Sequence, residues 1–465
     1  MRKITAHKYM DKEKEFRKLA LQRQISQRRR KQSGRAKNVL LMMAIWLVMT
    51  GNLTGCMKQG AGTGATTETP ATSERNTVEI ITTEPTATAP TTTEPTTMAP
   101  TTTEPTTAET TTMEEETTTQ VEDIHVTAEK YAAKLLAEMT LEEKVGQMFI
   151  ARCPAGNAAA KAAEYKLGGY ILFGRDFKDR TYEQAMQYIA ELQSEVKLPM
   201  LIGVDEEGGT VNRVSRYSQY RATPFKAPQE LYTAGGFEAV AADAKDKSEF
   251  LLSLGINLNF APVCDVSTNE TDFIYNRSFG KDATMTAEYI EKVVLAMSDS
   301  GMGSVLKHFP GYGNNADTHT GMAYDERPYE NFVQSDFLPF RAGIEAGADV
   351  VMVSHNIVVS MDTEYPASLS SKVHEILRNE LGFNGVIVTD ELSMEGITDF
   401  ADASNAAVLA VKAGNDLLCC TNFEEQVPAV IAAVQTGEIS EEQINESVYR
   451  ILLMKISLGI INIDM

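Results

Sequence analysis

The chain has 465 residues, of which 43% are hydrophobic and 7% aromatic, and its formal net charge is −21. This length accommodates one large domain or two to three small ones. Residues 1–38 hold 14 of the 43 Lys and Arg but only 3 of the 64 Asp and Glu, which leaves 29 basic against 61 acidic residues in the rest. So acidic a remainder argues against nucleic acid as a partner and suits a protein outside a membrane.

The N-terminal segment is typical of a targeting sequence rather than of a folded element. An apolar run over 39–49 follows a basic stretch and is too short for a spanning helix, which needs about 20 residues. It leads to Leu-Thr-Gly-Cys at 53–56, which resembles a bacterial lipobox. We therefore expect Cys56 to be lipidated and to anchor the protein on the outer face of a bacterial cell membrane, under a Gram-positive-type wall. An uncleaved signal anchor is the alternative.

Residues 57–123 consist largely of Thr, Pro, Glu and Ala, with repeats such as TTTEPTTMAP. Almost nothing in this segment can be buried, so we expect an extended linker. The predicted organisation is a targeting region over 1–56, the linker over 57–123 and a single catalytic domain over 124–465.

From residue 124 onward, short apolar runs alternate with amphipathic helical stretches, the clearest of which are 181–196, 284–301, 369–382 and 440–460. This alternation predicts parallel strands joined by helices. Eight such runs indicate an α/β fold of the (β/α)8 TIM-like barrel type, with a doubly wound sheet as the alternative. The expected strands are 145–152, 168–174, 200–209, 256–266, 304–311, 350–358, 385–392 and 416–421.

Charged residues follow five of these apolar runs. A single acidic residue after a strand is often a helix cap, but catalytic groups of such barrels gather at the carboxyl ends of the strands. Five charged strand ends on one face therefore predict a polar active site there. The residues concerned are Asp205, Glu206, Glu207, Asp265, Lys307, His308, His355, Asp390 and Glu391.

The stretch 305–321, VLKHFPGYGNNADTHTG, is the most informative about chemistry. Lys307 and His308 stand where Pro and Gly end a strand. Asp317 and His319 follow in the polar loop, and an Asp two residues from a His can orient the ring and raise its basicity. An ordinary turn with a solvated His is the alternative reading.

Several motifs together resemble glycoside hydrolase family 3, and most of all its β-N-acetylglucosaminidase (NagZ-type) branch. They are KHFPGYG…DTH, VDEEGGTVNR, NRSFG and GVIVTDELSMEGI, and the resemblance covers about residues 130–460. Two departures from the branch pattern are Tyr312, where a second His is usual, and an Asp-x-His that comes one residue closer to the Lys-His pair.

The resemblance implies that Asp390 is the nucleophile and that His319, partnered by Asp317, is the acid/base. It also implies substrate-binding roles for Asp205, Arg213, Arg277, Lys307 and His308, to which we add His355 from its place at a strand end. Such a pair fits retaining hydrolysis, which needs a carboxylate nucleophile and a proton donor that later acts as a base.

We therefore expect a retaining exo-β-N-acetylglucosaminidase that removes terminal GlcNAc from cell-wall glycans. The alternatives are a β-glucosidase, a β-xylosidase or a glycoside phosphorylase of the same family, and a non-catalytic glycan-binding lipoprotein. No cofactor is expected, and the His spacing does not indicate a metal site. The oligomeric state is left open. Cys153, Cys264, Cys419 and Cys420 are expected to be buried structural residues.

Overall fold

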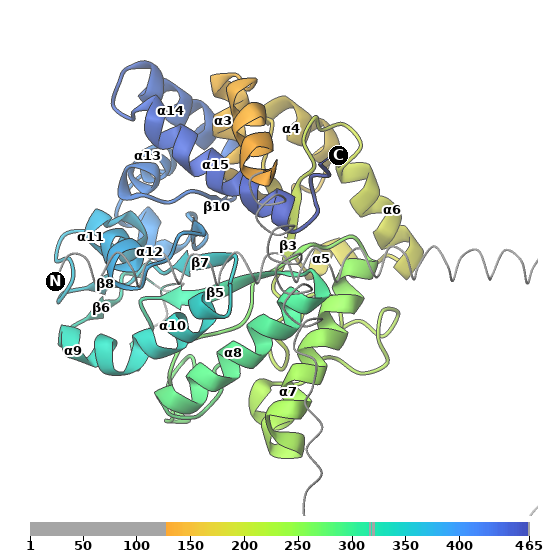
Figure 1. Ribbon diagram of the computed structural model, residues 1–465, viewed down its shortest axis with the longest axis vertical. Coiled ribbons are helices and arrows are strands. Elements are labelled where there is room, and N and C mark those ends of the chain that lie inside the picture. Colours follow the sequence, from red (N-terminus) through yellow and green to blue (C-terminus); the bar gives the residue numbers. More distant parts are fainter. Residues whose placement is uncertain (1–126, 316–317, 319–320, 464–465) are drawn as a thin grey trace, which may run out of the picture. The chain divides into compact units, whose positions relative to one another are not determined.

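The computed structural model describes residues 127–315, 318 and 321–463, and these form a barrel of parallel strands surrounded by helices (Figure 1). The main sheet has eight strands in the order β10-β1-β2-β3-β4-β5-β7-β9. A parallel bridge between Val388 and Leu417 joins the two ends of this order and closes the barrel. The expected (β/α)8 fold is confirmed. The strands are β1 (Phe149–Arg152), β2 (Gly169–Leu172), β3 (Leu201–Val204), β4 (Leu258–Asn259), β5 (Gly303–Phe309), β7 (Val350–Val353), β9 (Val386–Thr389) and β10 (Leu418–Cys420).

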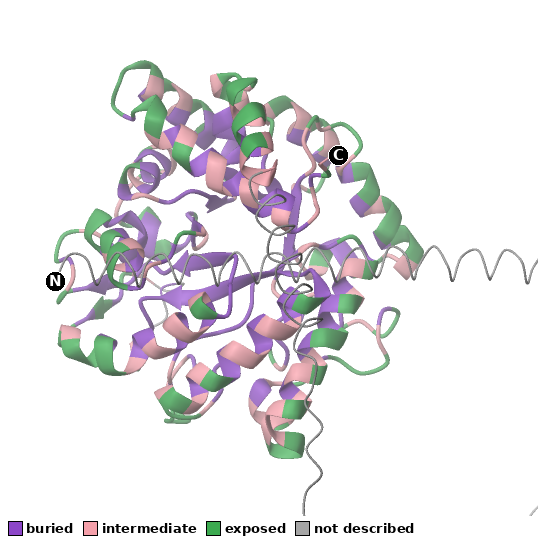
Figure 2. Ribbon diagram, in the orientation of Figure 1, coloured by how far each residue is buried: buried purple, intermediate pink, exposed green. Residues whose placement is uncertain are grey.

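Helices lie between successive strands, and their outer surfaces carry most of the exposed residues (Figure 2). A helical stretch over 127–137 precedes them. The helices are α3 (Leu141–Gln147), α4 (Ala158–Tyr165), α5 (Gly174–Phe177), α6 (Tyr182–Leu192), α7 (Pro228–Ser253), α8 (Ala283–Ser300), α9 (Tyr329–Asn331), α10 (Phe337–Glu345), α11 (Ser371–Glu375), α12 (Glu395–Thr398), α13 (Ala403–Ala413), α14 (Phe423–Gln435) and α15 (Glu441–Ser457). Among the residues placed by the structure, no helix has the length and apolar character needed to cross a membrane.

Local sequence explains where several helices begin and end. Thr140 accepts a hydrogen bond from the Glu143 backbone N–H, while the Glu143 carboxylate accepts one from the Thr140 backbone N–H. This reciprocal cap satisfies two backbone donors that the first turn of α3 would otherwise leave unpaired. Asp282 caps α8 through the Met285 N–H, and Gly301 ends that helix in the left-handed conformation that glycine adopts without a steric cost.

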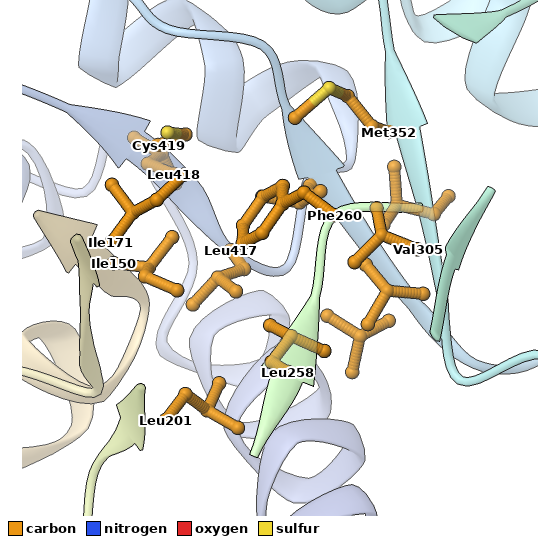
Figure 3. Close-up of a cluster of buried hydrophobic side chains, with 14 of the residues drawn as sticks. Ile150, Ile171, Leu201, Leu258, Phe260, Val305, Met352, Leu417, Leu418 and Cys419 are labelled. Atoms are coloured by element: carbon orange, nitrogen blue, oxygen red, sulfur yellow. The ribbon is translucent and has the colours of Figure 1, made fainter. Parts of the chain in front are cut away.

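The strands are buried on both faces, and their side chains fill the barrel interior (Figure 3). Gly203 in β3 makes room at the centre of this core. A Cβ at this position would lie 2.6 Å from the ring of Phe260 and 3.3 Å from Ile150, closer than carbon atoms pack. The missing side chain therefore allows the Phe260 ring to occupy the middle of the barrel.

Some expected boundaries are wrong. The first strand begins only at Phe149, because the capped helix α3 occupies 141–147. The third ends at Val204, and the acidic residues after it belong to a loop. The expected helix over 369–382 divides into α11 and the π-helical turn η4 (Ile376–Glu380). A second, two-stranded parallel sheet of β6 (Tyr324–Asp325) and β8 (Ile357–Val358) was not expected.

The four cysteines of the described chain are free and buried, as expected. Burial raises the pKa of the Cys153 thiol to about 12. Cys264, Cys419 and Cys420 are likewise buried thiols whose pKa lies well above the ordinary value for the same reason. A thiol with so high a pKa forms little thiolate, which fits a packing role.

Lys455 of α15 is a fully buried amine, and no carboxylate of the described residues pairs with it. Its Nζ donates to Gln147 Oε1 at 2.7 Å, and Gln147 in turn donates to the Lys166 backbone carbonyl. Burial lowers the pKa of Lys455 from 10.5 to about 7. The uncharged amine is therefore the form that this part of the fold accommodates best.

Replacing Lys455 by Met should remove a pH dependence of stability. Between pH 7 and 10.5 the unfolded chain binds a proton at Lys455 that the folded chain does not, so wild-type stability rises with pH, by roughly 1.4 kcal/mol per pH unit at most. The measurement is the free energy of unfolding of both proteins from pH 7 to 10. Over this range the free energy of unfolding of the wild type should rise relative to that of Lys455→Met. The control is Lys412→Met, which removes an exposed ammonium paired with Glu438. A constant difference between wild type and Lys455→Met would contradict the assignment.

Candidate active site

The carboxyl ends of five barrel strands bring charged side chains to one edge of the barrel. Because the strands are parallel and neighbouring, residues that follow them meet at this edge. The five charged strand ends that the sequence indicates therefore lie on the same face of the fold. They follow β3 (Asp205 to Glu207), β4 (Asp265), β7 (His355) and β9 (Asp390, Glu391), or stand at the end of β5 (Lys307, His308).

Lys307 is the centre of an ion-pair network at this edge. Its Nζ lies 2.8 Å from Asp205 Oδ1 and 2.7 Å from Glu207 Oε1. Arg277 donates to both Glu207 oxygens, from Nη2 at 2.8 Å and from Nε at 3.0 Å. Two cations thus share two carboxylates, and the Lys307 side chain is only 2% exposed.

Burial alone would favour the neutral form of each group in this network. For Lys307, the Asp205 and Glu207 carboxylates outweigh burial and raise the pKa above its usual value. For Glu207, burial is likewise outweighed, and the Arg277 and Lys307 cations hold the pKa well below its usual range. Glu207 therefore stays ionised near neutral pH and cannot act as a proton donor.

His308 has a hydrogen-bond partner at each ring nitrogen. Its Nδ1 lies 2.7 Å from Asp265 Oδ2, and its Nε2 lies 3.2 Å from Arg277 Nη2. Since a guanidinium can only donate, Nε2 accepts and the ring proton resides on Nδ1. The Asp265 carboxylate also accepts the backbone N–H groups of His308 and Tyr312.

Lys307 and His308 are consecutive in one strand yet belong to the same network. Successive strand residues ordinarily point to opposite faces. The register of β5 against β7 shifts between Leu306 and Phe309, so the alternation is interrupted at these two residues. The irregularity places both side chains at the active-site edge.

Glu206 stabilises the conformation of the loop after β3. This fully buried carboxylate accepts hydrogen bonds from three successive backbone N–H groups, those of Arg213, Val214 and Ser215, at 2.8, 2.8 and 3.1 Å. The brace brings the Arg213 guanidinium to 3.8 Å from Asp205. Glu206 therefore positions Arg213 rather than facing a ligand.

Asp390 follows β9 and is half-buried. Its backbone N–H donates to the Val353 carbonyl at 3.0 Å, and its Oδ1 accepts from the Glu391 N–H at 2.8 Å. Glu391 has a different environment, because its carboxylate accepts from the Ser393 N–H and from the Thr421 hydroxyl beyond β10. Burial raises the pKa of Glu391. The two adjacent carboxylates thus have distinct partners.

His355, expected to contact substrate, is fully buried in this structure. Its Nε2 donates to the Glu391 carbonyl at 3.0 Å, because a carbonyl only accepts, and its Nδ1 therefore accepts from the Ser368 hydroxyl at 2.8 Å. Both ring nitrogens have protein partners. The ring therefore supports the loop that carries Asp390, and its expected contact with substrate stays a prediction.

Asp317 and His319 lie outside the described residues, so their geometry stays a prediction. Thr318, between them, is fully buried, and its Oγ1 shares a 2.6 Å hydrogen bond with the Tyr312 hydroxyl. Burial and the nearby Asp390 charge raise the pKa of Tyr312, so the phenol stays neutral. A Cβ at Gly396 of α12 would lie 3.2 Å from the Thr318 carbonyl oxygen, which shows that α12 packs on this loop.

Arg327 ties the two ends of the same loop together. Its Nη2 donates to the Gly311 carbonyl at 3.0 Å and to Asp325 at 2.7 Å, and its Nη1 donates to Asp336 at 3.0 Å. The β6–β8 pairing then joins the end of the loop to the segment after β7. The loop expected to carry the acid/base is therefore anchored at its start, at Thr318 and at its end.

The structure thus brings Asp205, Arg213, Arg277, Lys307 and His308 into one network through contacts between them. The sequence placed Glu206, Glu207 and Asp265 at strand ends without assigning them roles. Two buried cations, Lys307 and Arg277, require nearby carboxylates, and this requirement is the signal that points to Glu207. Among the residues with described positions, no group of three or more His, Cys, Asp or Glu could hold a metal ion.

A parallel barrel with paired carboxylates and cations at its carboxyl edge is an architecture typical of sugar-cleaving enzymes. Residues 140–454 match the Glycosyl hydrolase family 3 N terminal domain. The chain belongs to this glycoside hydrolase family, as its motifs indicate.

Relatives within the family carry consistent names. The chain is 32% identical over 336 residues to beta-hexosaminidase LpqI of Mycobacterium tuberculosis, which covers 70% of this chain and 84% of that protein. It is also 32% identical over 328 residues to beta-hexosaminidase A of Pseudoalteromonas piscicida, covering 64% of this chain but only 54% of that longer protein. The chain therefore matches about half the length of the second relative.

A solved structure shares the fold. The glycoside hydrolase family 3 beta-N-acetylglucosaminidase from Paenibacillus sp. str. FPU-7 aligns with a TM-score of 0.65 and 35% sequence identity. The alignment covers 69% of this chain and 63% of that one.

Replacing Tyr312 by Phe should slow glycoside hydrolysis more than it weakens the fold. The change removes the hydroxyl that holds Thr318, and loss of one hydrogen bond costs about 1 kcal/mol, whereas misplacing a catalytic loop by 1 Å can lower the rate by about 100-fold. We expect at least a ~10-fold fall in kcat. Tyr170→Phe is the matched control, since it removes a buried hydroxyl that donates to the Ala158 carbonyl at 2.8 Å. Equal effects of both variants on kcat would show that the hydrogen bond between Tyr312 and Thr318 does not position the loop for catalysis.

Proposed function

We propose that the protein is a retaining exo-β-N-acetylglucosaminidase that removes terminal β-linked GlcNAc from cell-wall, peptidoglycan-derived glycans. The observation that carries the proposal is the half-buried Asp390 carboxylate at the carboxyl edge of a barrel whose neighbouring strand ends hold the Lys307 network. The names of the relatives support the substrate.

In this proposal the Asp390 carboxylate attacks the anomeric carbon and forms a glycosyl-enzyme intermediate. One oxygen, Oδ1, accepts the Glu391 N–H at 2.8 Å, which helps to fix the orientation of the carboxylate. Water then hydrolyses the intermediate and configuration is retained. Glu391 does not compete for this role, because Ser393 and Thr421 hold its oxygens.

The ion-pair network is proposed to hold the sugar. Asp205 accepts hydrogen bonds from sugar hydroxyls, and Arg213, Arg277 and Lys307 donate to hydroxyl and carbonyl oxygens. Because Glu207 and Asp205 already fix the Lys307 ammonium, the donors need little reorganisation when substrate binds. His308 contributes a ring whose orientation Asp265 sets.

His319 is proposed to protonate the departing oxygen and then to activate water, with Asp317 as its partner. An imidazole titrates near neutrality and can serve both steps. Glu207 and Tyr312 are poor substitutes. The first is kept ionised by its cations, and the second holds its proton tightly.

Asp390→Ala should lower kcat on an aryl β-N-acetylglucosaminide by roughly 10³-fold or more, since the adjacent carboxylate, Glu391, is held by Ser393 and Thr421 and does not replace it. Incubation with a fluorinated glycoside that slows hydrolysis of the intermediate should label Asp390, as read by peptide mass spectrometry. Glu391→Gln is the control and should still be labelled on Asp390. A label on Glu391 or elsewhere in the wild type would refute the nucleophile assignment.

His319→Ala should slow substrates with poor leaving groups far more than those with good ones. General acid catalysis contributes roughly 10²–10⁴-fold, and nitrophenolate leaves without it whereas a sugar alcohol does not. The measurement is kcat/KM over a series of leaving groups. Asp317→Asn should give a weaker form of the same pattern, because the ring remains but loses its partner. An equal loss across the series would restrict His319 to substrate positioning.

We also propose that the protein is anchored through a lipidated Cys56 on the outer face of the cell membrane, with 57–123 as the linker to the barrel. Cys56 and the linker lie outside the described residues, and the lipobox-like sequence is what supports the proposal. Labelled fatty acid fed to the producing cells should enter the wild type and not Cys56→Ser. Incorporation into the variant would rule out Cys56 as the acylated residue.

A further inference from the structure

Two arginines gather around one aromatic ring beside the sugar-binding network. Arg152, the last residue of β1, lies with its guanidinium carbon 4.6 Å from the centre of the Phe173 ring, and Arg213 lies 5.6 Å from the same centre. Arg175, two residues beyond Phe173, donates to the Cys153 carbonyl and has a 45% exposed side chain. Three cationic groups thus meet at the carboxyl ends of β1, β2 and β3.

The donors of this cluster are largely unused within the protein. Over 127–315, 318 and 321–463, the Arg152 guanidinium makes no hydrogen bond and no ion pair, and its Nε is buried without an acceptor. Arg213 Nε is also buried without an acceptor, and its contact with Asp205, at 3.8 Å, is too long for a hydrogen bond. Buried donors without partners are rare in native proteins and call for an explanation.

Other arginines of the barrel also stack on aromatic rings, and their hydrogen bonds can be compared with those of Arg152. Four of them donate from at least one nitrogen to a protein oxygen: Arg180, Arg221, Arg327 and Arg378. A fifth, Arg216 over Tyr217, makes no hydrogen bond within the described residues but is exposed to solvent, whereas Arg152 makes none there although its Nε is buried.

Nearby carboxylates do not neutralise the cluster. Asp205 is engaged by Lys307 at 2.8 Å. Asp176 is buried, its Oδ2 accepts the Phe173 N–H at 2.8 Å, and its Oδ1 lies 3.9 Å from Arg175 Nε. Burial raises the pKa of Asp176, opposed by its arginine neighbours. This cluster therefore carries positive charge although the chain as a whole has a net charge of −21.

We propose that Arg152 and Arg213, held by Phe173, form an oxyanion-binding subsite beside the sugar site, with Arg175 adding charge. A planar guanidinium suits both carboxylate and phosphate oxygens. The occupant is a carboxylate carried by the part of the substrate outside the cleaved sugar, or inorganic phosphate. The Arg213–Asp205–Lys307 contacts make this subsite continuous with the sugar site, so its place in catalysis rests on the proposed function.

A substrate carboxylate and inorganic phosphate would affect the reaction in different ways. A substrate carboxylate would make acidic glycosides better substrates than neutral ones. Phosphate would instead attack the anomeric carbon of the glycosyl-enzyme, form a carbon–oxygen bond as the Asp390 carboxylate leaves, and yield a glycosyl phosphate. Both depend on the Arg152 guanidinium.

The first test is equilibrium binding to the full chain, independent of turnover. Isothermal titration with inorganic phosphate and with lactate should detect binding of at least one anion by the wild type. Arg152→Met, which keeps an unbranched side chain over Phe173 but no charge, should bind it about 10–100-fold more weakly, as expected for a charge-assisted hydrogen bond. Arg341→Met, which removes one charge from α10, is the control and should bind as the wild type does.

The second test is kinetic and separates the two sources. The substrates are an aryl β-N-acetylglucosaminide and its analogue with a carboxylate on the aryl group, each with and without phosphate. A loss of kcat/KM in Arg152→Met for the carboxylate analogue alone identifies a substrate carboxylate. Loss of glycosyl phosphate formation identifies phosphate.

Arg152→Lys should restore binding only in part, since an ammonium lacks the planar pair of donors. Absence of anion binding by the wild type, or equal binding by Arg152→Met, would overturn the subsite. If no β-N-acetylglucosaminide is cleaved by the wild type, the proposed function fails, and the titration still decides on the subsite.

Discussion

The buried ammonium of Lys307 is the interaction on which the active-site edge depends. A charge removed from water is tolerated only with close counter-charges, and Asp205 and Glu207 supply them from the loop after β3. Glu207 in turn holds Arg277, and Arg277 contacts His308. Buried ion pairs are weak evidence of net stability. Their effect here is geometric, because each charge restricts where the next one can lie.

This dependence explains why the network includes more carboxylates than the chemistry uses. The removal of one partner from a buried pair costs about 3–5 kcal/mol, because the other charge is left unpaired. Glu207 and Asp265 are therefore part of the support for Lys307, Arg277 and His308. Glu206 acts differently, through three backbone N–H groups rather than through a cation.

The barrel and the identity of its charged edge were predictable from sequence. Strands buried on both faces appear as short apolar runs, and the residue after such a run in a parallel barrel must lie at one edge. The separate roles of Asp205, Glu206 and Glu207 were not predictable, because three consecutive acidic residues form one pattern in sequence. Lys307 and Arg277, the partners of Asp205 and Glu207, come from segments 70 to 102 residues away. Glu206 instead accepts backbone N–H groups 7 to 9 residues further along the chain. The support that His355 gives to the Asp390 loop was not predictable either, since Ser368 and the Glu391 carbonyl become its neighbours only in the fold.

The small β6–β8 ladder joins two loops to which the proposed mechanism assigns different catalytic groups. Tyr324 and Asp325 end the loop that contains Thr318, while Ile357 and Val358 continue the segment of His355, whose ring holds the Glu391 carbonyl. The loop of the proposed proton donor and the loop of the proposed nucleophile are thus connected through four residues of backbone pairing. Substitutions on this ladder, far from the sugar, would shift the proposed proton donor and the proposed nucleophile together. The spacing between the two groups would be preserved, while their position relative to the barrel would change.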